Sequence, residues 1–72
     1  MYFVKNVTWK PTPQGTYVFG VATTNGNYFE VEVDEPTYDP SKLELIAMLL
    51  DLLAAVNNTK YTGVRLAARS RR

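Results

Sequence analysis

Polar and apolar residues alternate along the first half of the chain in a way that is typical of β-strands. Three stretches rich in aromatic and β-branched residues predict strands at 2–10, 16–24 and 27–35. Between the first two lies Pro11–Gly15, where proline ends a strand and glycine permits a turn. Between the last two lies Asn25-Gly26, a strong signal for a two-residue hairpin turn. The pattern therefore predicts an antiparallel three-stranded meander.

The expected turn also predicts which side chains share a face of the sheet. Pairing Thr24 with Asn27 sets small residues of the second strand opposite large residues of the third, and leaves a seat for a helix. The predicted core face then holds Val18, Gly20, Ala22, Phe29, Val31 and Val33. The other face would carry Tyr17, Phe19, Val21 and Tyr28 beside Glu30, Glu32 and Asp34. Such a face is either a solvated set of cross-strand pairs or a recognition surface.

One long helix is predicted after the third strand. It begins either with Asp39 as the cap and proline at the first helical position, or with Ser41 and Glu44 as a capping box. It ends near Asn57, where two consecutive asparagines can adopt the left-handed stop. Residues 61–68 then predict a fourth strand, parallel to an earlier one if the crossover is right-handed. The fold is therefore expected to be α+β: a meander, one long helix packed on the sheet and a short fourth strand, in a single domain of residues 1–68.

This predicted helix is apolar around most of its circumference. At about 100° per residue, the polar positions fall in one narrow stripe, with Met48 at its edge, and the apolar arc spans roughly 220°, where a helix on a core needs only about 100°. The polar stripe comprises Ser41, Glu44, Asp51, Ala55 and Asn58. The surplus arc comprises Leu45, Leu49, Leu52 and Val56. It is either an interface or is covered by a strongly curled sheet, with the fourth strand and the loops wrapping around the helix.

Charge divides the chain unequally. Residues 1–59 hold three lysines against seven acids, a net charge of −4, whereas residues 60–72 hold five basic residues and no acid, a net charge of +5. The basic residues of this end are Lys60, Arg65, Arg69, Arg71 and Arg72. This end either meets an anionic partner such as nucleic acid, folds back on an acidic strand, or is solvated, with residues 69–72 as a basic tail.

Composition excludes several kinds of chemistry. Without cysteine or histidine the chain can form no disulfide, thiolate metal site, ordinary zinc site or histidine-based catalytic triad. Carboxylates remain for acid–base or Mg²⁺ chemistry, but no phosphate-binding loop is present, so we expect no enzymatic activity, no cofactor and no metal. Neither a signal peptide nor an apolar stretch long enough to cross a bilayer is recognised, which predicts a cytoplasmic protein that does not enter membranes.

The predicted order strand–strand–strand–helix–strand, with Leu43-Glu44-Leu45-Ile46-Ala47 opening the helix, resembles the first half of a ribonuclease H-like fold. That resemblance implies a Mg²⁺-binding role for the helix glutamate, which Glu44 matches. The family's other catalytic aspartates would fall near Asn6 and near Ala68 or Ser70, where no acid stands. The resemblance therefore implies a degenerate, non-catalytic relative. Small phage inhibitors of host machinery such as RNA polymerase are similarly built from a short sheet and one helix.

These observations predict a non-catalytic protein-binding module: a regulator or inhibitor of phage type, a homodimer formed through the helix, or both. The predicted partner-binding residues are Tyr17, Phe19, Tyr28, Glu30, Glu32, Leu45, Leu49, Leu52 and Val56. The first alternative is a nucleic-acid-binding protein that uses Lys60, Arg65, Arg69, Arg71 and Arg72 on phosphates. The second alternative is the degenerate ribonuclease H-like protein.

Overall fold

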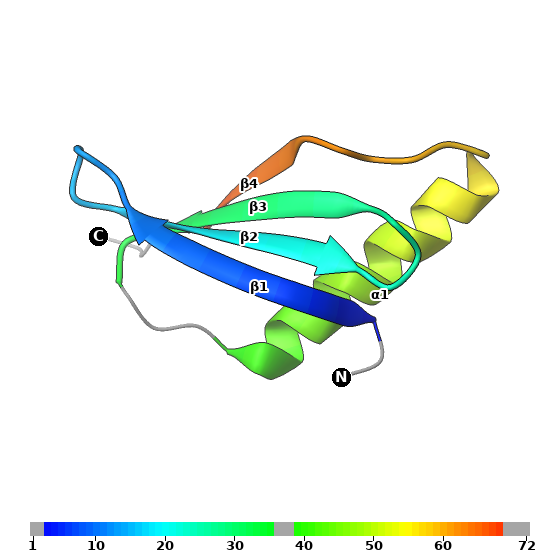
Figure 1. Ribbon diagram of the computed structural model, residues 1–72, viewed down its shortest axis with the longest axis horizontal. Helices are drawn as coiled ribbons and strands as arrows, with labels where there is room; N and C mark the ends of the chain where they lie inside the picture. The colour runs from blue at the N-terminus through cyan, green and yellow to red at the C-terminus, as the bar shows by residue number, and fades with distance from the viewer. Residues whose placement is uncertain (1–2, 36–38, 69–72) are drawn as a thin grey trace.

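A computed structural model describes residues 3–35 and 39–68 of the chain. Within these ranges the sheet has four strands in the order β1-β2-β3-β4, with one helix, α1, lying across one face (Figure 1). The strands are β1 (Val4–Pro11), β2 (Tyr17–Thr23), β3 (Tyr28–Val33) and β4 (Val64–Ala68), and α1 spans Pro40–Val56. The predicted α+β architecture is confirmed, including the antiparallel β1-β2-β3 meander and the fourth strand, which runs parallel to β3.

Both hairpin turns of the meander have three-residue loops that end in a left-handed glycine. Gly15 has φ +86° and Gly26 has φ +87°. In the second turn the Thr23 amide donates to the Asn27 carbonyl at 2.8 Å, so Thr23 pairs with Asn27. A type I′ turn would need positive φ at Asn25 as well, and Asn25 does not have it. The predicted two-residue turn is therefore wrong.

The longer loop moves β2 by one residue, which turns its side chains over relative to the predicted faces. Val21 pairs with Phe29 and Phe19 with Val31, and all four of these side chains are buried. The prediction was correct for β3 but reversed for β2, because side chains alternate along a strand and a one-residue shift exchanges the two faces. Phe19, expected on the outer face, is only 2% exposed.

The core lies between the helix-facing side of the sheet and one side of α1. Its buried members are Val21, Phe29, Val31, Leu43 and Ala47. Ala54 is also buried, and its place on the helix follows the same 3.6-residue period. Closest approach between α1 and the sheet is at β1 and β2, so α1 crosses the sheet obliquely and leaves β4 largely uncovered (Figure 1).

The ends of α1 follow the first of the two predicted starts. Asp39 is the N-cap, its Oδ1 accepts the Ser41 amide at 2.9 Å, and proline occupies the first helical position. The alternative capping box does not form, because Ser41 lies inside the helix and Asp39 is the N-cap. Oε1 of Glu44 accepts the Phe3 amide of the N-terminal segment at 3.2 Å. At the other end Asn58, with φ 53°, supplies the predicted left-handed stop.

Candidate interaction surface

The side of α1 that faces away from the sheet carries a stripe of large apolar residues in water. Leu45, Leu49, Leu52 and Leu53 are between 50% and 57% exposed, and Val56 is 81% exposed. Leu52 lies on the opposite side of the helix from the buried Leu43, at about 180° on a helical wheel. The expectation that one sheet cannot cover this helix is confirmed, and the alternative of a sheet curled around the helix does not hold for the described residues.

An apolar groove continues this stripe towards β4. It has a volume of about 380 Å³ and separates α1 from the last strand. Its lining residues are Phe29, Ile46, Leu49, Leu50, Leu53, Tyr61, Val64 and Leu66. Leu66 is itself 38% exposed. We refer to Leu45, Leu49, Leu52, Leu53 and Val56 of α1 together with Leu66 of β4 as the α1–β4 apolar surface.

The β4 part of this surface was not predicted from the sequence. Val64 and Leu66 alternate with Arg65 and Ala67, which is the signal that two apolar side chains share a face. Pairing Val64 with Phe29 and Leu66 with Val31 places both on the helix side of the sheet. Their exposure follows from the oblique path of α1, which the sequence pattern does not encode.

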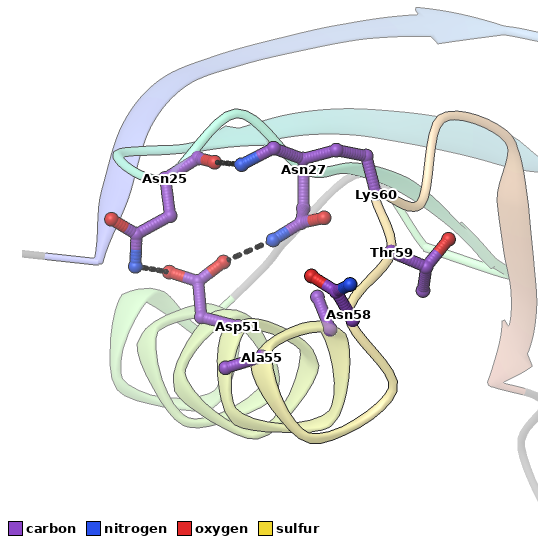
Figure 2. Close-up of a pocket in the computed structure, with 8 residues that line it drawn as sticks. Asn25, Asn27, Asp51, Ala55, Asn58, Thr59 and Lys60 are labelled. Atoms are coloured by element: carbon purple, nitrogen blue, oxygen red, sulfur yellow. Dashed lines mark hydrogen bonds between the residues drawn. The ribbon is translucent and has the colours of Figure 1, made fainter.

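A polar cluster lies on the side of α1 that carries the predicted polar stripe. Asp51 is only 7% exposed and points towards the β2–β3 turn (Figure 2). Its Oδ1 accepts the Thr23 hydroxyl and the Asn27 side-chain amide, each at 2.7 Å, and its Oδ2 accepts the Asn25 side-chain amide at 3.0 Å. Asp51 of the predicted polar stripe is therefore buried against the sheet, where its carboxylate fastens the helix to the turn.

The same cluster reaches the segment that leads into β4. The Asn27 side-chain oxygen accepts the Tyr61 amide at 2.9 Å, and Lys60 Nζ donates to the Asn25 carbonyl at 2.6 Å (Figure 2). Among the described residues, no buried side-chain nitrogen or oxygen lacks a hydrogen-bond partner. Asp51, Asn25, Asn27 and Lys60 line one part of a hollow of about 550 Å³, and Ala54, Ala55, Asn58 and Thr59 line the rest. The first four residues are joined by hydrogen bonds, which is the arrangement of a structural network.

The outer face of the sheet carries Tyr28, Glu30 and Arg65 in contact with one another. The Tyr28 hydroxyl donates to Glu30 Oε2 at 2.9 Å, and Arg65 donates to Glu30 Oε1 from Nε at 3.0 Å and from a terminal nitrogen at 2.6 Å. The hydrogen bonds from Arg65, and secondarily from Tyr28, lower the pKa of Glu30. Burial, reinforced by the bond to Glu30, raises the pKa of Tyr28.

The remaining predicted site residues fall into separate places. Glu32 accepts the Thr16 hydroxyl at 2.7 Å on the outer face. Tyr17 lies on the helix-facing side of the sheet, with its ring centroid 5.7 Å from that of the half-exposed Trp9. Arg65 folds onto Glu30, as the alternative of a basic end pairing with an acidic strand requires. The predicted contacts Arg69, Arg71 and Arg72, with the basic tail 69–72, lie outside the described residues.

Two classes of site are absent from the part of the chain that the structure describes. In residues 3–35 and 39–68, no three acidic side chains gather in a way that could hold a metal ion. In the same residues, no helix combines the length and the apolar character that crossing a membrane requires. Comparison with protein-family models, with curated proteins and with solved structures finds no match to this chain.

Proposed function

We propose that this chain is a non-catalytic protein-binding module that binds its partner through the α1–β4 apolar surface. The observation that carries the proposal is the exposure of five large apolar side chains on one side of α1, all at 50% or more. Large contiguous apolar patches on small proteins usually mark sites of association. In its narrower form the module is a small regulator or inhibitor, of the kind that phages direct at host machinery.

The energy available at this surface is large for a chain of this size. A Leu-sized side chain contributes about 1.5–3 kcal/mol when fully buried, so covering the exposed half of five such residues offers roughly 4–8 kcal/mol. The whole folding free energy of a 72-residue domain is about 4–11 kcal/mol at 0.05–0.15 kcal/mol per residue. A partner that covers the stripe therefore gains a driving force comparable to the stability of the domain.

Nucleic-acid binding has less support. Lys60 and Arg65, the two predicted phosphate contacts within the described residues, both bind groups of the same chain. The α1–β4 apolar surface carries no basic residue among its six members, whereas surfaces that bind nucleic-acid strands combine aromatic side chains with positive charge. Nothing in the comparisons bears on the ribonuclease H-like resemblance, which stays an interpretation of the element order.

The test is affinity capture from an extract of the native cells with tagged wild-type chain and tagged Leu49→Asp chain. Leu49 is 55% exposed, so the variant should remain folded, and we expect it to lose the captured proteins. Gln14→Asp, an exposed change in the distant β1–β2 turn, is the control and should capture them as the wild type does. Retention of the same proteins by folded Leu49→Asp would contradict the proposal. If the tagged chain instead captures nucleic acid, if this capture falls as the salt concentration is raised, and if Leu49→Asp does not change it, the nucleic-acid-binding alternative is favoured.

A further inference from the structure

The exposed side of α1 has the spacing of a seam between two helices. Lys42, Leu45, Leu49, Leu52 and Val56 follow one another at intervals of three, four, three and four residues. This is the a/d pattern of a heptad repeat, in which a strip of side chains packs into the holes of a facing helix. A helix that only covers a sheet needs no such strip on its far side, and α1 already meets its own sheet through Leu43, Ala47 and Ala54.

We propose that a second copy of this chain covers the seam, with α1 packing antiparallel against α1 of its partner around a two-fold axis. The inference rests on the protein-binding function proposed above and names the partner. In this pairing Leu49 lies opposite the partner subunit's Leu52, and Leu45 lies opposite the partner subunit's Val56. The two-fold axis repeats both contacts, so four apolar layers form from two helices.

The charges of α1 favour the antiparallel direction. Lys42, exposed in the first turns of α1, is the one charged residue of the seam. In an antiparallel pair it lies beyond the last apolar layer, beside the C-terminal end of the partner's helix, where the peptide dipoles leave partial negative charge. The last turn of α1 contains no basic residue of its own to neutralise that charge. A parallel pair would instead bring the two Lys42 side chains together in one layer.

The area of the surface is also sufficient for a pair of chains. With about 180 Å² for a fully exposed Leu, the four apolar residues of the seam expose roughly 400 Å², and the neighbouring Leu53 and Leu66 raise this to roughly 600 Å². A two-fold pair that covers all six residues in both chains therefore buries about 1,200 Å², the lower end of the range of specific interfaces. Backbone and flanking side chains add to this value. A two-fold interface joins the same patch of both chains. The seam is apolar apart from one lysine and contains no acid, so it is complementary to a second copy of itself and needs no matching pattern of charges on a different protein.

Sedimentation equilibrium of the purified chain between about 1 µM and 1 mM is the first test, and we expect a dimer. Leu49→Asp places two carboxylates against the seam and should weaken the dimer by at least about 100-fold, whereas Gln14→Asp should leave it unchanged. Lys42→Ala, which does not touch the core, should weaken it by roughly threefold to thirtyfold. This second variant decides the question if Leu49→Asp fails to fold.

Cysteine cross-linking tests the direction, because the chain has no cysteine of its own. In the antiparallel pair, Leu45→Cys and Val56→Cys chains form a disulfide when mixed, but neither does so alone, since like positions lie about 16 Å apart along the helix axis. Cross-linking of each variant alone would show a parallel pair and overturn the inference. A Gln14→Cys chain is the control for random oxidation.

A wild-type chain that remains monomeric at 1 mM would overturn the second copy as the partner. So would a dimer that folded Leu49→Asp and Lys42→Ala leave intact, since its contact would lie elsewhere. Neither result would touch the protein-binding function itself, which fails only if capture of other proteins survives the loss of Leu49. The two failures are therefore distinguishable.

Discussion

Replacement of Asp51 by alanine should remove a large part of the stability of the fold. The carboxylate is 7% exposed and accepts hydrogen bonds from Thr23 and Asn27, both of which are 2% exposed, and from the exposed Asn25. Asp51→Ala leaves two buried donors without an acceptor, at about 1–3 kcal/mol each. The Asn25 amide can turn to water and adds little. The expected loss in the free energy of unfolding is therefore about 2–6 kcal/mol.

Two further variants separate the hydrogen-bond network from general packing. Asp51→Asn keeps one oxygen, which can serve both buried donors, so it should lose only the strengthening due to the charge, about 1 kcal/mol. Asn25→Ala removes one exposed donor and should change the free energy by less than about 1 kcal/mol. The assay is urea unfolding followed by far-UV circular dichroism, with fluorescence of the one tryptophan, Trp9, as a second probe of two-state behaviour.

The relative sizes of these losses test the role of Asp51. A loss of less than about 1 kcal/mol for Asp51→Ala would show that the donors find other acceptors, and that the carboxylate does not fasten the turn to the helix. Equal losses for Asp51→Ala and Asp51→Asn would show that the negative charge, and not the accepting oxygen, is what matters. The first result would refute the assignment of this cluster as the link between α1 and the β2–β3 turn, and the second would refute the expectation that an uncharged acceptor can replace the carboxylate.

Three further predictions concern the sheet. Gly26→Ala places a side chain on a backbone with φ +87° and should lower the free energy of unfolding by about 1–2 kcal/mol. Gly63→Ala, where nothing lies near the added Cβ, should change it little, and the midpoints of urea unfolding of the two variants measure the difference. The pKa of Glu30 is lowered in the folded state, so its ionised carboxylate stabilises the fold fully above the ordinary glutamate pKa of about 4.3, and this stabilisation is lost as the pH falls below that value. Glu30→Gln should therefore lower the free energy of unfolding at pH 7 and make it depend less on pH in the acid range, as measured by unfolding at several pH values. Gly20→Ala places a Cβ against the Tyr28 hydroxyl and should lower the free energy of unfolding by about 1–3 kcal/mol. This loss should be smaller when Tyr28 is also replaced by alanine, and an equal loss in the two backgrounds would show that the contact with Tyr28 is not its cause.

The sequence predicts the elements of this fold better than their register. Apolar periodicity and turn residues are local signals, and they place each strand and the helix within a few residues of its observed bounds. The β2–β3 register depends on which of two turns forms at Asn25-Gly26: the two-residue turn, or the three-residue loop that ends in a left-handed glycine. Contacts with distant residues accompany the observed register, because Thr23 and Asn27 must face α1 for their side chains to reach Asp51. Asp51 lies 28 positions from Thr23 and 24 positions from Asn27 in the sequence.

The candidate surface was likewise predicted only in part. The surplus arc of α1 follows from helical geometry alone, and its four predicted members are all exposed. The burial of Asp51 against the sheet was not predicted, because a carboxylate in a periodic pattern gives no sign of hydrogen-bond partners on another element. The groove beside β4 depends on the crossing angle of α1, which is set by packing against β1 and β2.

The parallel placement of β4 has a consequence for how the chain folds. Each hairpin joins residues that are close in the sequence, whereas Glu30 and Arg65, paired across β3 and β4, are 35 positions apart. Long loops lose more entropy on closure, so we expect the meander to form early and β4 to dock last, after α1 is in place. Until that final step the edge of β3 is open, and a stalled chain would be prone to pair with strands of its neighbours.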